Sequence, residues 1–201
     1  MKNNQNPLLK HEILNQLTLI HFLIDTEEDF DVSKKEEINH LIHLTSLLVA
    51  HQDFIIEGKP DFFTEIFDLK EVIEIVVDIH EEKIGRSKVQ IQPLGEKAMV
   101  QADRMMTKEV LDVIIHHLIK TSSSIGFKFN GSTHELSIAY EGPTMDIKNI
   151  SVIDCLKQKK MSLREKILLI TIRLAEGTDI KVEALPGEVR VKFLGFLYNV
   201  K

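Results

Sequence analysis

A stripe of apolar residues with a helical period, near the start of the chain, constrains the fold most strongly. Between residues 7 and 26 its members recur at intervals of four, four, three and four: Leu9, Ile13, Leu17, Ile20 and Ile24. This spacing predicts an amphipathic helix, with Asn6 as its cap and Pro7 in its first turn. A second helix is predicted from about Ser33 to Ile56. Its inward stripe would be Ile38, Leu41, Ile42, Thr45, Leu48 and Val49.

The segment between these two helices is the short acidic stretch EEDFDV, residues 27–32. Two long helices joined by a short connector form an antiparallel hairpin. A hairpin is only two helices thick, so it cannot enclose its own apolar stripe. We therefore predict a homodimer in which two hairpins complete a four-helix bundle.

The pattern changes after EGKPD, residues 57–61, where a glycine and a proline follow the second helix. We predict one domain over residues 1–58 and a second over residues 61–201. In the second domain, strands are expected at 63–68, 88–92, 127–130, 135–140, 179–184 and 188–193, and helices at 69–84, 107–121 and 162–176. Turns are expected at Asn130-Gly131 and at 185–187. This order predicts an α+β fold, an α/β sandwich with helices on one face of a mixed sheet.

Composition narrows the functional classes. The chain has 201 residues, of which 43% are hydrophobic and 28% charged, so it can bury a core and is not a disordered tail. Its net charge is −6 and it has no block of Lys and Arg, which argues against a nucleic-acid partner. No apolar run approaches the roughly 18 residues of a membrane span. The single cysteine, Cys155, and the polar start predict a soluble protein of the reducing cytoplasm.

The segment HEILNQLT, residues 11–18, carries the candidate chemistry. His11, Asn15 and Thr18 share one face of the first helix, about 100° or more away from the apolar stripe. An exposed neutral imidazole is a competent nucleophile that can accept and release a phosphoryl group near neutral pH. Glu12 is the adjacent carboxylate and could hydrogen-bond the other ring nitrogen and take up its proton. Asn15 could orient a water molecule for hydrolysis.

The stretch HEILNQLTLI resembles the phosphoacceptor box of two-component histidine kinases and histidine phosphotransferases, on the first helix of a dimerising hairpin. The resemblance implies that His11 is the phosphorylated residue and Glu12 its acid/base partner. It also implies that Asn15 stands at the position tied to phosphatase activity.

The rest of the chain resembles the ATP-binding domain of the same kinases, the GHKL or Bergerat fold. FDLKEVIEIVVDIHEEK matches its first helix, and VQADRMMTKEVLDVIIHHLIKTS matches its N-box helix, with Asp103 and Lys120 at familiar places. YEGPTM stands where the first glycine box belongs, and EGTDIKVEALPGEVRVKFLGF resembles the closing hairpin. Residues 146–161 match nothing in that fold.

The nucleotide site departs from the family pattern. The magnesium-binding asparagine and the polar residue one turn earlier are replaced by His117 and Val113, and Tyr140 stands in place of the adenine-binding aspartate. Gly142 is kept, but Thr144 replaces the second glycine, and the last helix is not preceded by a glycine-rich loop. Backbone N–H groups crowd around phosphates only where glycine allows it. The resemblance therefore implies a degenerate site that binds nucleotide weakly or not at all.

An intact phosphoacceptor box joined to a degenerate ATP-binding fold resembles the ChpT-like and sporulation-relay histidine phosphotransferases. The resemblance implies a phosphotransferase that carries a phosphoryl group on His11 between the receiver aspartates of response regulators, without ATP. The receiver would bring Mg²⁺, and the second domain would serve as a docking wall. Two alternatives stay open: a divergent ATP-dependent histidine kinase, and a dimeric pseudokinase that binds or dephosphorylates a response regulator.

No metal or further catalytic site is predicted. His116 and His117 are adjacent and diverge by about 100° on a helix, so with Asp112 they make poor joint ligands. His40 and His43 could share a face, but no third ligand is evident. Cys155 has no evident activating partner and is expected to be a buried or inert thiol.

Overall fold

The computed structural model describes residues 6–26, 31–52, 55, 63–87, 89–94, 97–147 and 150–195. Contacts within the chain divide it into two compact units. One unit combines Met1–Asp61 with Val152–Ile167, and the other combines Phe62–Ser151 with Leu168–Lys201. The division therefore assigns a segment from the second half of the sequence to the N-terminal unit, and it cuts one helix in two.

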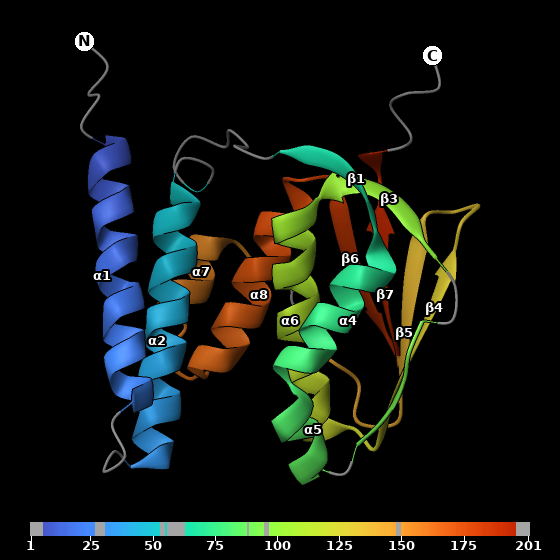
Figure 1. Ribbon diagram of the computed structural model, residues 1–201, viewed down its shortest axis with the longest axis horizontal. Coiled ribbons are helices and arrows are strands. Elements are labelled where there is room, and N and C mark those ends of the chain that lie inside the picture. The colour runs from blue at the N-terminus through green and yellow to red at the C-terminus, as the bar shows by residue number, and fades with distance from the viewer. Residues whose placement is uncertain are drawn as a thin grey trace. The chain divides into compact units, whose positions relative to one another are not determined.

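The first unit contains the predicted helical hairpin. α1 (Asn6–Thr26) and α2 (Val32–Ala50) lie side by side and run in opposite directions (Figure 1). The helix predicted over residues 7–26 is confirmed. α2 ends at Ala50, whereas the prediction placed the end of the second helix at Ile56; residues 53, 54 and 56 of the predicted range lie outside the described residues.

The inward stripe predicted for α2 is partly wrong. Leu44 and Leu47 are the buried residues of this helix, whereas Leu41 and Thr45, both predicted to face inward, are exposed. The Thr45 hydroxyl donates to the carbonyl oxygen of Leu41 at 2.8 Å, so it is satisfied within its own helix. Leucines occupy several helical phases of this segment, and periodicity alone does not choose among them.

The first unit also contains α7 (Val152–Lys157) and the first turn and a half of α8 (Leu163–Glu176). Ser162 and Glu165 form a capping box at the start of α8: the Ser162 N–H donates to the Glu165 carboxylate at 2.8 Å, and the Glu165 N–H donates to Ser162 Oγ at 3.2 Å. Cys155 of α7 is buried, and its burial raises the pKa of the thiol, opposed by the nearby charge of Lys166. The expectation of a buried thiol is confirmed.

The second unit holds two sheets. β1 (Thr64–Asp68) pairs antiparallel with β3 (Met99–Asp103). The larger sheet has the order β2-β4-β5-β7-β6, and its strands are β2 (Gln90–Gln92), β4 (Ser124–Asn130), β5 (Glu135–Tyr140), β6 (Ile180–Leu185) and β7 (Glu188–Phe193). β2 is parallel to β4, and the other neighbours are antiparallel. The predicted mixed sheet is therefore confirmed.

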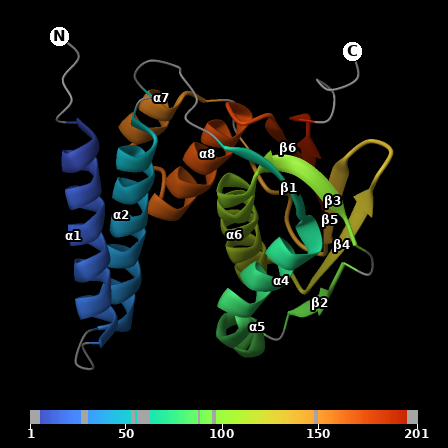
Figure 2. The ribbon, with the colours of Figure 1, turned by 45° about the horizontal axis from the view of Figure 1, so that its top comes forward.

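Helices α4 (Leu69–Ile79), α5 (Glu81–Ser87) and α6 (Arg104–Thr121) lie on one face of the five-stranded sheet (Figures 1 and 2). This arrangement is the α/β sandwich that the sequence predicts. Fully buried apolar side chains fill it from both layers, and they include Leu111, Ile114 and Leu118 of α6 and Ile125, Leu136 and Ile138 of the sheet. Burying each of these side chains stabilises the fold by about 1.5–3 kcal/mol.

Three of the differences between predicted and observed elements in the second unit are of three residues or more. The helix predicted over 69–84 is broken at His80 into α4 and α5. α6 begins at Arg104 rather than Thr107, because the Asp103 carboxylate accepts the Met106 N–H at 2.8 Å and caps the helix. β4 begins at Ser124 rather than Phe127, because its first residues pair with β2.

Two elements were not predicted: β3, which pairs with β1 at a distance in sequence, and α7, which lies in the unmatched region 146–161. The turn expected on Asn130-Gly131 extends over residues 131–134. No helix among the described residues is both long and apolar enough to cross a membrane.

Candidate functional site

The predicted phosphoacceptor face lies on α1. The helix runs without a break through residues 11–18, so His11 and Asn15 are about one turn apart along it. The side chains of His11 and Glu12 lie outside the described part of the chain. Asn15 and Thr18 are exposed, and the Thr18 hydroxyl donates to the carbonyl oxygen of Leu14 at 2.9 Å. The Thr18 hydroxyl is therefore hydrogen-bonded within its own helix. Asn15 is the described polar side chain of this face that is exposed and could contact a partner or a water molecule.

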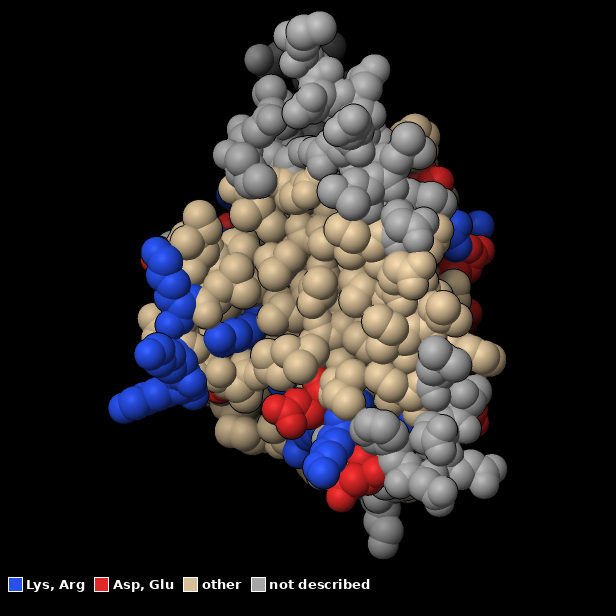
Figure 3. All heavy atoms as spheres, turned by 90° about the vertical axis from the view of Figure 1, so that its left-hand side faces the viewer, with Lys and Arg blue, Asp and Glu red and all other residues tan. Residues whose placement is uncertain are grey.

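The hairpin also exposes large apolar side chains. They are Leu19, Ile20 and Phe22 of α1 and Leu41 of α2, with Phe22 62% exposed. Figure 3 looks onto the face that carries α1, and the described atoms at the centre of this view belong to residues without charge. Ile20 belongs to the stripe that the sequence predicts as inward, yet it remains exposed in the single chain. Apolar surface of this kind marks an interaction site in many proteins.

In the second unit, the two positions that the resemblance aligns with the magnesium-binding residues of the kinases lie on α6. Val113 is buried and His117 is half-buried. Neither side chain carries the carboxamide oxygen that would coordinate a hard cation such as Mg²⁺. The residues present at these two positions therefore do not fit the magnesium ion of a kinase.

Tyr140, at the end of β5, is the residue that the resemblance aligns with the adenine-binding aspartate. This side chain is only 5% exposed, and its hydroxyl oxygen accepts a hydrogen bond from the Met145 N–H at 3.0 Å. The residue at the aligned position is therefore a buried aromatic ring rather than a carboxylate, and its hydroxyl oxygen is already hydrogen-bonded. The residues present do not fit an adenine ring held by a carboxylate at this position.

Gly142 has a structural explanation that does not involve a nucleotide. A Cβ atom at this position would lie 2.5 Å from the Thr121 carbonyl oxygen and 3.0 Å from Ser122 Oγ. Only glycine lets the turn after β5 approach the end of α6 this closely. Thr144, two residues on, is exposed.

The region that would wrap the triphosphate has no glycine between Gly142 and Gly177. Within the described part of that region, residues 152–157 form α7. A helix directs its N–H groups along its own axis and cannot supply the crowded amides of a phosphate loop.

Tyr140→Phe is expected to lower the free energy of unfolding by about 1–3 kcal/mol, because the buried Met145 N–H loses its acceptor. Chemical denaturation of the purified variant measures this cost. Phe129→Tyr is the control: it makes the opposite substitution on the neighbouring strand β4, where the side chain is half-buried. It should change the free energy of unfolding by less than about 1 kcal/mol. Equal stability of Tyr140→Phe and the unsubstituted protein would contradict the assigned role of the phenol.

The sequence did not reveal the contact between the buried His80 and the half-buried Asp112. His80 Nε2 lies 2.6 Å from Asp112 Oδ1, and the His80 ring stacks edge-on against His116 at 5.3 Å between centroids. His80 is buried at the junction of α4 and α5, while Asp112 belongs to α6. The pair therefore fastens the break between two helices to a third. No sequence signal links two residues 32 positions apart, and we assign the pair a structural role.

Solved structures similar to this one are histidine kinases. Acinetobacter baumannii histidine kinase AdeS is 18% identical with a TM-score of 0.53, over 94% of this chain and 96% of that chain. The cytoplasmic segment of histidine kinase QseC is 13% identical with a TM-score of 0.50, over 75% and 89%. Full-length ShkA in complex with AMPPNP is 12% identical with a TM-score of 0.52, over 96% of this chain and 45% of that chain. This chain has the histidine kinase fold.

The sequence itself matches no family model and no curated protein. The histidine kinase fold accounts for the mixed sheet, the helical face and the hairpin ahead of them. At these identities the likeness concerns the fold alone. The chemistry of this chain must be argued from its own residues.

Proposed function

We propose that this protein is a histidine phosphotransferase of a two-component phosphorelay. It would carry a phosphoryl group on His11 between the receiver aspartates of response regulators, without using ATP. The observation that carries the proposal is a contrast within one chain. The segment that resembles the phosphoacceptor box lies on α1, while Tyr140, at the position that the resemblance gives to the adenine-binding aspartate, is buried and hydrogen-bonded.

The transfer step uses groups that the box supplies. A neutral His11 nitrogen attacks the phosphorus of a receiver acyl phosphate, a P–N bond forms, and the P–O bond to the aspartate breaks. The aspartate leaves as a carboxylate, and Glu12 holds or accepts the proton of the other ring nitrogen. The receiver would bring the Mg²⁺ that neutralises charge on the phosphoryl oxygens. Return of the group to a second receiver is the same step in reverse.

The proposed partners are receiver domains and a second copy of this chain. The exposed apolar residues of the hairpin support dimerisation, because a second hairpin would bury them in a four-helix bundle. The proposed location is the cytoplasm, where the receivers would be met.

Phe22→Glu is expected to weaken the dimer by at least about 100-fold, because each copy would place a charge in an apolar interface. Light scattering should show a mass near 23.1 kDa for the variant and near twice that for the unsubstituted protein. Phe63→Glu is the matched control, since Phe63 is 78% exposed and precedes β1, outside the hairpin. Dissociation of both variants, or of neither, would contradict a dimer formed through the hairpin.

The function is tested by offering the purified protein two phosphoryl donors in parallel. One is a receiver domain carrying labelled acyl phosphate, and the other is labelled Mg-ATP. The expected result is acid-labile, base-stable label on the protein from the receiver and none from ATP. Label from ATP would instead establish the divergent kinase.

A second candidate is a pseudokinase that dephosphorylates a receiver, and the exposure of Asn15 favours it. In that case the receiver would lose its phosphoryl group to water, with no labelled histidine at any time. Rapid-quench sampling separates the two, because a phosphotransferase passes through a labelled intermediate.

A further inference from the structure

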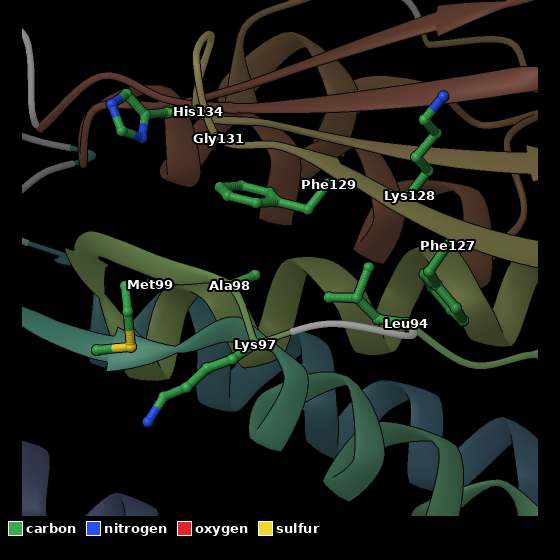
Figure 4. A pocket seen from close by; sticks show the side chains of 9 residues that line it. All are labelled: Leu94, Lys97, Ala98, Met99, Phe127, Lys128, Phe129, Gly131 and His134. Carbon is green, nitrogen blue, oxygen red and sulfur yellow. The ribbon is translucent and has the colours of Figure 1, made fainter.

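A groove lies in the second unit, away from the positions of the degenerate nucleotide site. It has a volume of about 580 Å³ and runs between β4 and the segment that leads into β3. Figure 4 shows its lining from both sides, with the rings of Phe127 and Phe129 turned from β4 toward Leu94 and Met99. Lys97 lies at the edge of the opposite wall, and Lys128 of β4 also borders the groove.

β4 has an open main-chain edge where it borders the groove. β2 covers β4 only as far as the pair Gln92 and Gly126. Among the residues that the structure describes, no strand pairs with β4 on that edge beyond Gly126, although β5 pairs with it to Asn130 on the other edge.

The hydrogen-bonding direction of this open edge follows from the ladder. The Tyr140 N–H donates to the Gly187 carbonyl oxygen at 2.9 Å, so Tyr140 directs its main-chain groups away from β4, and its partner Ile125 directs its own away from β5. Main-chain groups alternate between the two edges of a strand, so Phe129, four residues on, directs its N–H and C=O to the same open edge. An open edge with an apolar wall beside it is the arrangement to which extended peptides add as a further strand.

The side chains of β4 define the sequence that such a strand should have. Phe127 and Phe129 point to one face of the sheet and Lys128 to the other, as Figure 4 shows. A strand added beside β4 must alternate in the same way, with apolar residues against the two rings and the intervening residue beside Lys128. Lys128 takes part in no ion pair among the described residues, so acidic residues match the positions of an added strand that lie beside it, on the face opposite the two rings.

We propose that the groove beside β4 is a docking site for an extended segment of a partner protein in which acidic and apolar residues alternate. The segment adds to the sheet next to residues 127–130. Its apolar side chains enter the groove against Phe127 and Phe129, and its acidic side chains face Lys128. The site belongs to the second unit and uses no residue of the phosphoacceptor helix.

The test measures binding of a fluorescein-labelled hexapeptide of sequence EVEFEV to the full-length protein by fluorescence anisotropy. Saturable binding is expected, with slowed amide exchange at Phe129 by at least about 10-fold. Lys128→Glu should weaken binding at least about 10-fold, because it places like charges beside each other. Lys181→Glu is the matched control, since Lys181 is an exposed lysine of β6 at the opposite edge of the same sheet, and it should leave binding unchanged.

The block peptide EEEVVF has the same composition without the alternation, and it should bind at least about 10-fold more weakly. Equal binding of the two peptides would overturn the proposal, because it would show charge attraction without strand register. The Lys128→Glu variant is first shown to be folded by circular dichroism. If it binds the peptide as tightly as the unsubstituted protein, the peptide binds elsewhere and the proposal is also overturned. Absence of saturable binding up to about 1 mM would have the same consequence.

Discussion

His11→Ala protein is expected to take up no label from a phosphorylated receiver, a loss of at least about 1,000-fold relative to the unsubstituted chain. The substitution removes the proposed nucleophile, and the other histidine of α1, His21, lies ten residues further along the helix. The measurement is the initial rate of transfer from a receiver carrying labelled acyl phosphate, at equal dimer concentration.

His21→Ala is the control for this prediction, because His21 is an exposed histidine on the same helix, ten residues on. It should transfer at the unsubstituted rate. Glu12→Gln should slow transfer by about 100-fold, since general acid–base assistance is worth about 10²–10⁴. Transfer by the His11→Ala protein at an undiminished rate would exclude His11 as the phosphoacceptor.

Leu118→Ala is expected to produce the largest loss of stability, about 3 kcal/mol. Leu118 is 0% exposed on α6, and it lies in the core between this helix and the sheet. Truncation removes buried apolar atoms and leaves a cavity, which together cost about 2–5 kcal/mol for leucine. The melting temperature should fall by roughly 6–12 °C, as differential scanning calorimetry would record.

Met105→Ala is the control on the same helix, because Met105 is 68% exposed. Its effect should stay within about 0.5 kcal/mol. A small effect at Leu118 and a large one at Met105 would mean that α6 presents its other face to the sheet, and the assigned positions of Val113 and His117 would then be wrong as well.

Tyr140 shows which properties of the candidate site can be predicted from the sequence. The sequence predicts that the adenine-binding carboxylate is missing, because a tyrosine stands there. It does not predict that the phenol is buried and accepts the Met145 N–H, or that Gly142 is pressed against the Thr121 carbonyl. Those contacts join segments whose spacing in the chain carries no periodic signal.

α1 and α8 were predicted to within one residue at each end, although Asn6, predicted as the cap of the first helix, is the first residue of α1 itself. Helices were predicted poorly where a distant contact decides the boundary. His80 ends α4 while its side chain pairs with Asp112 of another helix, and α6 begins early because Asp103 caps it at the end of a strand that was itself missed. Sequence periodicity reports which face of an element is apolar, but not what lies against that face.

The sequence by itself determined the mixed α+β fold and the helical hairpin, and it contains the segment from which we propose a phosphoacceptor at His11 and a degenerate nucleotide site. These features can be predicted because they depend on residue types and on spacings of one or two helical turns. Only the tertiary structure showed that the Tyr140 hydroxyl is buried and accepts the Met145 N–H, and that His80, between α4 and α5, contacts Asp112 of α6. Only the tertiary structure showed that β2 pairs with no more than the first half of β4. The His80 contact and the end of β2 depend on partners far away in sequence, and the Tyr140 hydrogen bond depends on the path of the loop that follows β5. Packing and hydrogen-bond completion decide these features, and local preference does not.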